Sequence, residues 1–281
     1  MILVFGKNGQ VASELGRCGS VELHGRETAD FTDPATCARL VEETKANAII
    51  NAVAYTNVDA AETDEKLARQ VNAETPGAIA RAAAERNLPL VHISTDYVFD
   101  GAGEAAFTPD HPTAPLGAYG RSKLAGEGVV RRAGGPHAIL RTSWVVSAHG
   151  KNFVKTMLRL GVERDALTIV ADQIGGPTCA SDIAAACLEI ARQLQRGPGK
   201  SGTYHYSGAP DVSWADFARE IFQQAGMATC VTDISTSDYS TPARRPLNSR
   251  LDNHRTEAIF GLARPDWRPG LGRILKELGA A

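Results

Sequence analysis

Residues 2–12 decide the fold, and they read Ile-Leu-Val-Phe-Gly-Lys-Asn-Gly-Gln-Val-Ala. Four apolar residues predict a buried strand, and the glycines behind them predict a tight turn into a helix. Gly6 and Gly9 would let the backbone approach a pyrophosphate, while the helix N-terminus would offer it unpaired N–H groups. Ala12 takes the third small-residue position. The stretch predicts a dinucleotide-binding loop; the alternative is a turn that binds nothing.

Short apolar runs alternate with longer helical patterns beyond this loop. The runs predicted as strands are 2–5, 48–53, 88–93, 138–140 and 167–170. Helices are predicted at 61–87, 153–160, 181–194 and 213–225, the first of them divided near Pro76 and the last capped by Ser213. Such a βαβ series implies an α/β fold, a Rossmann-type doubly wound parallel sheet with helices on both faces. We expect this sheet to extend past residue 150.

The last third of the chain is rich in prolines and turns and predicts a smaller C-terminal lobe. We expect a Rossmann domain over residues 1–146, to which a segment near 166–196 returns. The substrate-binding lobe would then comprise residues 147–165 and 197–281.

Composition narrows the class of protein. The 281 residues carry a formal net charge of -2, so the chain has no positive field with which to attract nucleic acid. Its five cysteines form no C-x-x-C pair, which argues against a disulfide framework or a zinc site and favours a reducing, cytoplasmic setting. The apolar start ends at Gly6, too short for a signal peptide or a membrane span, so we expect no membrane partner.

The residues about twenty positions beyond the glycine loop bear on cofactor choice. A site specific for NAD places an acidic residue there, on the ribose 2′-hydroxyl. This chain has Leu23-His24-Gly25-Arg26 instead. Arg26 could bind a 2′-phosphate, which favours NADPH and leaves NADH open. The alternative is that Arg26 is a solvated surface residue.

Tyr119 and Lys123 carry the strongest chemical signal. They are four residues apart at the start of a predicted helix, so the phenol and the ammonium can face the same cleft. A nearby cation favours the phenolate, and Tyr119 could then act as a general acid toward a carbonyl oxygen. Tyrosine and lysine at this spacing also occur by chance on many helices, so the pair needs its context.

Residues 94–101, Ser-Thr-Asp-Tyr-Val-Phe-Asp-Gly, supply that context. They follow a predicted strand and therefore lie at the carboxyl edge of the sheet, where ligands bind in such folds. Thr95 could hydrogen-bond the developing alkoxide beside Tyr119. The alternative is that Thr95 and Asp96 only cap the next turn.

Together these motifs resemble the extended short-chain dehydrogenase/reductases and, within them, the dTDP-4-dehydrorhamnose reductase family. The resemblance covers nearly the whole chain. It rests on GKNGQV at the start, STDYVFDG at 94–101, YGRSKLAGE at 119–127, RTSWV at 141–145, NFVKTML at 152–158 and RPLNSRLD at 245–252. The last three are more particular to this family.

The resemblance implies reduction of a 4-keto group on a dTDP-linked deoxysugar. Hydride would come from the nicotinamide, Tyr119 would protonate the oxygen, Lys123 would hold the ribose and lower the pKa of the tyrosine, and Thr95 would complete the set. The implied cofactor contacts are Gly9, Gln10, Val11, Asp30, Phe31, Ala54, Tyr55 and Thr56, beside Tyr119 and Lys123. Asp96 and Trp144 match contacts to the sugar nucleotide.

Some of these residues also allow a plainer interpretation. Trp144 could be a core aromatic residue and Asp30 a turn residue. His92 is interpreted as a core histidine with satisfied hydrogen bonds and not as a catalyst. Family members that bind Mg²⁺ near a dimer contact use acidic residues; Glu14 matches one, but the second position falls near the uncharged Ser181. The sequence therefore does not support a Mg²⁺-bridged dimer, while a homodimer as such stays open.

Two other functions remain. An epimerase, dehydratase or different reductase of nucleotide sugars would share the glycine loop and the Tyr/Lys pair, although the first two recycle NAD and would need an acidic residue where His24-Gly25-Arg26 stands. A non-catalytic regulatory subunit that binds NADP, such as that of methionine adenosyltransferase, would keep the fold. Such a subunit would have no need of Thr95, Tyr119 and Lys123 together.

Overall fold

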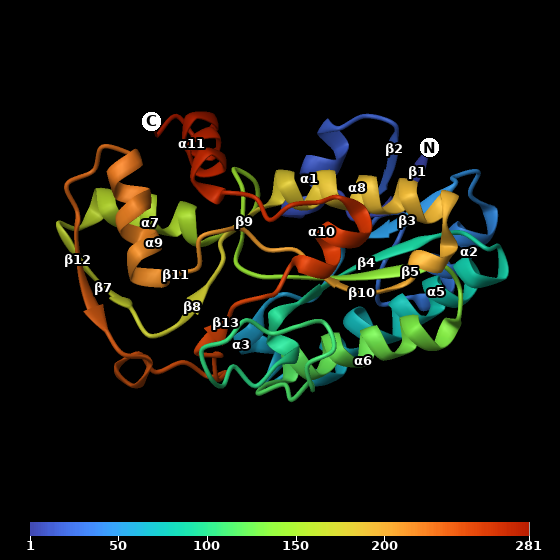
Figure 1. Ribbon diagram of the computed structural model, residues 1–281, viewed down its shortest axis with the longest axis horizontal. Coiled ribbons are helices and arrows are strands. Elements are labelled where there is room, and N and C mark those ends of the chain that lie inside the picture. Colours follow the sequence, from blue (N-terminus) through green and yellow to red (C-terminus); the bar gives the residue numbers. More distant parts are fainter. Residues whose placement is uncertain (281) are drawn as a thin grey trace.

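A six-stranded parallel sheet forms the centre of the larger lobe in the computed structural model, which describes residues 1–280. Its strand order is β10-β5-β4-β3-β1-β2, and every neighbouring pair is parallel (Figure 1). The strands are β1 (Ile2–Phe5), β2 (Val21–His24), β3 (Ala48–Asn51), β4 (Leu90–Thr95), β5 (His137–Thr142) and β10 (Gly202–His205). The predicted parallel sheet is confirmed.

Helices cover both faces of this sheet (Figure 1). One face carries α1 (Gln10–Arg17) and α8 (Ala180–Arg196); the other carries α2 (Pro34–Glu43), α5 (Thr75–Glu85) and α6 (Ala118–Ala133). Successive strand residues enter opposite cores: Val4 packs with α1 and α8, whereas Phe5 packs with α2 and α5. Because both faces are buried, the strands read as continuous apolar runs.

The helix predicted at 61–87 forms as three consecutive pieces behind a short helix, α3 (Val58–Ala61). They are α4 (Glu65–Arg69), a π-helical turn (Gln70–Glu74) and α5. Pro76 lies in the first turn of α5, where its missing N–H does no harm, so the division falls one turn earlier than predicted. The π turn carries the buried Asn72, whose amide bonds the backbone of Tyr55.

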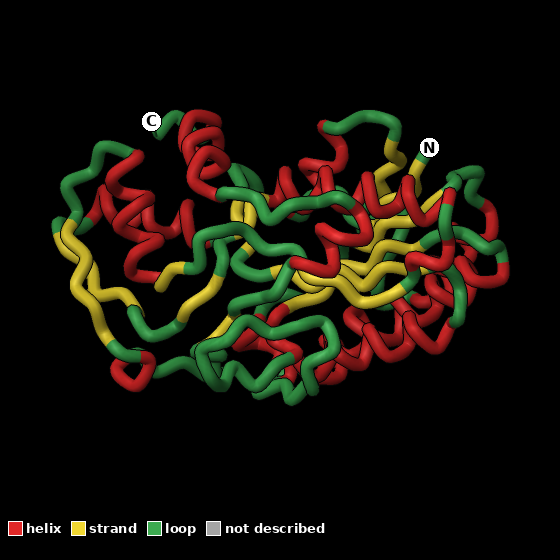
Figure 2. The backbone as a smooth tube through the Cα atoms, viewed as in Figure 1, coloured by secondary structure: helices red, strands yellow, loops and turns green. Residues whose placement is uncertain are grey.

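The smaller lobe has its own core and three small sheets. Its helices are α7 (Phe153–Glu163), α9 (Trp214–Gln224) and α11 (Trp267–Glu277); α9 is capped by Ser213, as predicted. Its strands are β6 (Val145–Val146), β7 (Ala166–Val170), β8 (Ile174–Gly175), β9 (Thr178–Cys179), β11 (Val212–Ser213), β12 (Cys230–Ile234) and β13 (Asn248–Ser249). The remaining elements are α10 (His254–Phe260) and short 3₁₀ turns at Asp96–Val98, Pro198–Lys200 and Thr236–Asp238. Figure 2 shows long loops where the two lobes meet.

Two segments lie in a different sheet from the one predicted. The run 167–170 forms β7 but pairs with β12 in the small lobe, so it does not extend the central sheet. Residues 202–205, expected in the small lobe, form the edge strand β10 beside β5. β7 is apolar but half exposed, and β10 begins with Gly-Thr. The hydrophobic patterns of these two strands therefore did not show which neighbouring strand each would pair with. The helix α10, also expected in the small lobe, packs on the large one, where Phe260 joins the core formed with α8 and Tyr204 of β10. Outside these segments the two-lobe division stays a prediction.

Within residues 1–280 no helix combines the length and the apolar character that crossing a membrane requires.

Candidate active site

A cleft of about 940 Å³ runs along the carboxyl edge of the central sheet, where ligands bind in such folds. The structure brings all the predicted site residues to its walls, from the glycine loop to Trp144. The predicted cofactor residues that line it are Gly6, Gly9, Gln10, Val11, Arg26, Asp30, Phe31, Ala54, Tyr55 and Thr56. Their roles stay predictions.

The glycine loop is built for close approach. Gly6 has φ +120°, and a side-chain carbon there would lie 3.1 Å from Cβ of Ala12, so this position requires glycine. Gly9 precedes α1 and offers no side-chain cap, so the first N–H groups of α1 are left for a ligand. The loop and the uncapped helix end together form a site suited to a pyrophosphate.

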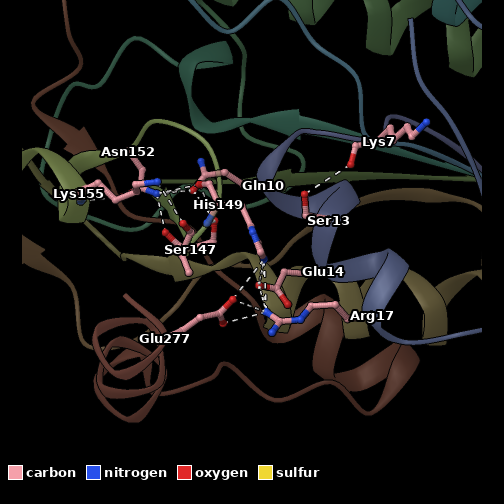
Figure 3. A network of polar contacts seen from close by, with 11 residues as sticks. Lys7, Gln10, Ser13, Glu14, Arg17, Ser147, His149, Asn152, Lys155 and Glu277 are labelled. Carbon is pink, nitrogen blue, oxygen red and sulfur yellow. Dashed lines mark hydrogen bonds and ion pairs between the residues drawn. The ribbon is translucent and has the colours of Figure 1, made fainter. Parts of the chain in front are cut away.

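The side chain of Gln10 joins this loop to the small lobe (Figure 3). Its amide nitrogen donates to the carbonyl of Val145 at 3.2 Å. Its amide oxygen accepts from the hydroxyl of Ser147 at 3.0 Å and from Asn152 at 2.9 Å. These bonds leave one N–H of the Gln10 amide without a partner in the part of the chain that the structure describes, so a contact of Gln10 with the cofactor would come from that N–H or from its backbone.

The predicted catalytic residues lie on the floor of the cleft. Thr95 ends β4, and Tyr119 and Lys123 lie one turn apart at the start of α6. The Lys123 ammonium, buried with the rest of its side chain, donates to the carbonyl of Ile93 at 2.6 Å. Gly120 lets α6 approach closely, because a side chain there would collide with the carbonyl of Tyr97. The Tyr97 ring packs edge-on against Tyr119, 5.5 Å between centroids.

Burial governs the protonation of these groups. It lowers the pKa of Lys123 to about 8, against the opposing effect of the Glu127 carboxylate. Burial also raises the pKa of Tyr119, and the Asp96 charge adds to this, while the Thr95 hydroxyl lowers it. The net shift in the pKa of Tyr119 is upward, opposite to the direction that the family resemblance implies. Asp96 has its pKa raised to about 6, again by burial first.

A buried ion pair supports this floor from below. Glu127, one turn beyond Lys123 on α6, accepts two hydrogen bonds from the guanidinium of Arg141, at 2.8 and 2.7 Å, and one from the hydroxyl of Ser94 at 2.7 Å. Burial alone would raise the pKa of Glu127, but Arg141 holds it below its ordinary value. These contacts link α6 to β4 and β5 and so fix the position of the helix that carries Tyr119 and Lys123.

Trp144 is held in the cleft by a strained backbone and a second indole. Its φ of +47° is rare for a residue with a side chain. Its ring stacks on Trp214, with 3.5 Å between centroids and 10° between planes. Trp214, which also lines the cleft, was missed from the sequence, since nothing beyond its place after the Ser213 cap distinguished it. The two stacked rings form a flat apolar part of the cleft wall.

The outer end of the cleft is polar and exposed. Arg26 is 81% exposed and pairs with Asp30 at 3.3 Å. Asp30 also accepts hydrogen bonds from the backbone and hydroxyl of Thr32, as a turn residue would, yet it lines the cleft. His92, by contrast, is fully buried, as predicted, and its Nδ1 lies 3.1 Å from the amide nitrogen of Asn51. Its Nε2 has no hydrogen-bond partner within residues 1–280, so the prediction that its hydrogen bonds are satisfied is only half right.

The surroundings of Glu14 do not fit a divalent cation. The Arg17 guanidinium lies 2.8 Å from Glu277 and 3.7 Å from Glu14, so a protein cation already neutralises these carboxylates (Figure 3). His149 adds its ring at 3.4 Å from Glu14. Over residues 1–280 no three acidic, histidine or cysteine side chains are arranged to hold a metal.

A doubly wound sheet with a glycine loop after β1 and a Thr–Tyr–Lys set at its carboxyl edge defines an extended short-chain dehydrogenase/reductase. The family model described as the RmlD substrate binding domain matches residues 1–280. The chain belongs to the dTDP-4-dehydrorhamnose reductase family.

Relatives under this name match along almost their whole length. The chain is 44% identical to dTDP-4-dehydrorhamnose reductase of Burkholderia thailandensis over 99% of this chain and 98% of the relative. Identity to the Escherichia coli K12 enzyme is 39%, over 99% and 97%. A crystal structure of the Bacillus anthracis reductase in complex with NADP is 35% identical, with a TM-score of 0.90 and coverage of 98% of both chains.

Proposed function

We propose that this chain reduces dTDP-4-dehydro-β-L-rhamnose to dTDP-β-L-rhamnose with NADPH, the last step in making that sugar donor. The observation that carries the proposal is the convergence of Thr95, Tyr119 and Lys123 on the floor of the cleft that begins at the glycine loop. Family membership supplies the substrate class, and the relative crystallised with NADP supports the cofactor.

NADPH bound along the cleft supplies the hydride that reduces carbon 4 of the sugar. Tyr119 then donates its proton to the oxygen, because its raised pKa keeps the phenol protonated at neutral pH. Thr95 orients the same oxygen through its hydroxyl, and Lys123 holds the nicotinamide ribose with its ammonium. Thr95 and Lys123 are buried and Tyr119 is partly buried, which limits the access of water and strengthens these polar contacts.

Two residues of the cleft, Asp96 and Trp144, are proposed to contact the sugar nucleotide. Asp96 has a buried oxygen, Oδ2, without a hydrogen-bond partner in the described chain, and a sugar hydroxyl could satisfy it. The indole of Trp144, backed by Trp214, offers a flat face to the substrate. Both residues lie beside Thr95 in the same cleft.

The test is loss of NADPH absorbance by purified protein given enzymatically prepared dTDP-4-dehydro-L-rhamnose. NADH and a UDP-linked keto-sugar are run in parallel. Fast loss with the dTDP sugar supports reaction and substrate together. Binding of NADPH without turnover on any keto-sugar would instead favour the regulatory-subunit alternative.

We further propose that the protein works in the cytoplasm, where its substrate would be made. It acts there either as a monomer or as a homodimer. The absence of a C-x-x-C pair among its five cysteines supports the reducing compartment. Light scattering on the purified protein measures the oligomeric state directly.

A further inference from the structure

Each cation at the outer end of the cleft is paired with a carboxylate. Lys7, from the glycine loop, lies 2.7 Å from Glu27. Arg26 pairs with Asp30. These residues surround the end of β2, the part of such folds that receives the adenosine ribose.

The sequence pattern predicted no carboxylate at the tip of β2, yet Glu27 places one there. Gly25 is the first residue after β2, and a side-chain carbon on it would lie 2.8 Å from Oε1 of Glu27 and closer still to Oε2. The carboxylate therefore folds back over the strand tip, in the space that any other residue at position 25 would fill. The Lys7 ammonium holds it there from the opposite loop.

The two charges of this pair favour different cofactors. A carboxylate at the strand tip accepts hydrogen bonds from a ribose 2′-hydroxyl, which NADH has, and repels a 2′-phosphate, which NADPH has. Lys7 and Arg26 attract the 2′-phosphate, and the guanidinium can bind it through two hydrogen bonds. Glu27 competes with that phosphate for Lys7.

We propose that Glu27 decides how far this enzyme discriminates between NADH and NADPH: its carboxylate receives the 2′-hydroxyl of NADH, and it must leave Lys7 when the 2′-phosphate of NADPH enters. The inference rests on the proposed function only in that the cofactor lies in this cleft. Glu27 lies just outside the residues that line the cleft, and its neighbours Lys7, Gly25 and Arg26 line it. The inference assigns to Glu27 a contact with the adenosine ribose of the bound cofactor and no part in the chemistry.

Exposure makes this exchange easy. The side chains of Lys7 and Glu27 are 51% and 54% exposed, and ion pairs in water contribute little free energy. Rotating Glu27 away therefore costs little, and the cleft accepts both cofactors with a modest preference. The preference is electrostatic, so it weakens as salt is added.

The experiment compares binding of NADPH and of NADH to the wild-type protein and to Glu27→Gln, by titration without substrate. Removing the negative charge frees Lys7, so we expect NADPH to bind about tenfold more tightly and NADH severalfold more weakly. KM values for both cofactors should move in the same directions, with kcat unchanged. Glu163→Gln is the matched control, since Glu163 is similarly exposed and paired to Arg159 in the small lobe.

A second variant moves the carboxylate and keeps its charge. Gly25→Ala places a methyl group in the space of the Glu27 oxygens, and the flexible glutamate can swing away. NADH should bind more weakly in this variant too, while Glu163→Gln leaves the ratio of the two affinities unchanged.

An unchanged ratio in both Glu27→Gln and Gly25→Ala, with wild-type protein that binds and uses both cofactors, would overturn the inference and leave the proposed function standing. Binding of neither cofactor to the wild type would overturn both.

Discussion

The two ends of the cleft use the same kinds of side chain in opposite environments. At the inner end Lys123 and Glu127 are buried, and the pKa of Lys123 is brought to about 8. At the outer end Lys7 and Glu27 are about half exposed. The comparison teaches that burial makes a polar group reactive and structurally costly, whereas exposure leaves it free to exchange partners and so to select among ligands.

The largest effect is expected at the floor. Tyr119→Phe should lower kcat by about a hundredfold to ten-thousandfold, the usual effect of a lost general acid, with the affinity for NADPH unchanged. Steady-state rates and a cofactor titration check this. Tyr97→Phe, which alters the neighbouring ring, is the matched variant; an equal loss there would show that packing, rather than proton donation, is at stake.

Next comes the support beneath the floor. Glu127→Gln should lower the free energy of unfolding by about 3 kcal/mol, because it leaves the buried Arg141 guanidinium without its counter-charge. Urea unfolding measures the difference. The exposed pair of Arg159 and Glu163 gives the contrast. Glu163→Gln should change the free energy of unfolding by less than about 0.5 kcal/mol, and similar losses in the two variants would contradict the comparison of buried and exposed pairs.

Asp96 should show an effect that depends on pH. Its folded pKa of about 6 lies above its ordinary value of 3.8, so the folded state retains a proton that the unfolded state has lost. The carboxyl therefore destabilises the fold as pH rises through 6. Asp96→Asn should stabilise the protein by about 2 kcal/mol near pH 7.5 and by nothing near pH 4, as followed by urea unfolding at both pH values. An equal gain in the free energy of unfolding at both pH values would show that the charge of Asp96 does not destabilise the folded protein.

The smallest effect is expected at the exposed contact between α1 and α11. Arg17→Gln removes the guanidinium that bridges Glu14 and Glu277 (Figure 3). Because Arg17 and Glu277 are open to water, the free energy of unfolding should fall by less than about 1 kcal/mol, and less again at high salt. Thermal unfolding at two salt concentrations tests this. A loss as large as that of Glu127→Gln would show that the contact holds the lobes together.

Local patterns were enough to predict the fold class and most of the cleft. The apolar run before Gly6 and the i, i+4 spacing of Tyr119 and Lys123 report on geometry within a single turn or strand. Parallel strands end at one edge, so residues that follow them were expected to lie where ligands bind, and Thr95 does line the cleft. Family resemblance added Asp30, Trp144 and the residues after β3.

By itself, then, the sequence determined the doubly wound sheet, the glycine loop and the identity of the groups on the floor, because these depend on neighbours within a few residues. Only the tertiary structure decided which sheets contain β7 and β10. It also decided that Trp214 stacks on Trp144 and that Glu27 lies over the tip of β2, where it pairs with Lys7. The physical reason is the same in each case. Strand partners, ring stacking and ion pairs form between segments far apart in the chain, where no local pattern records the contact.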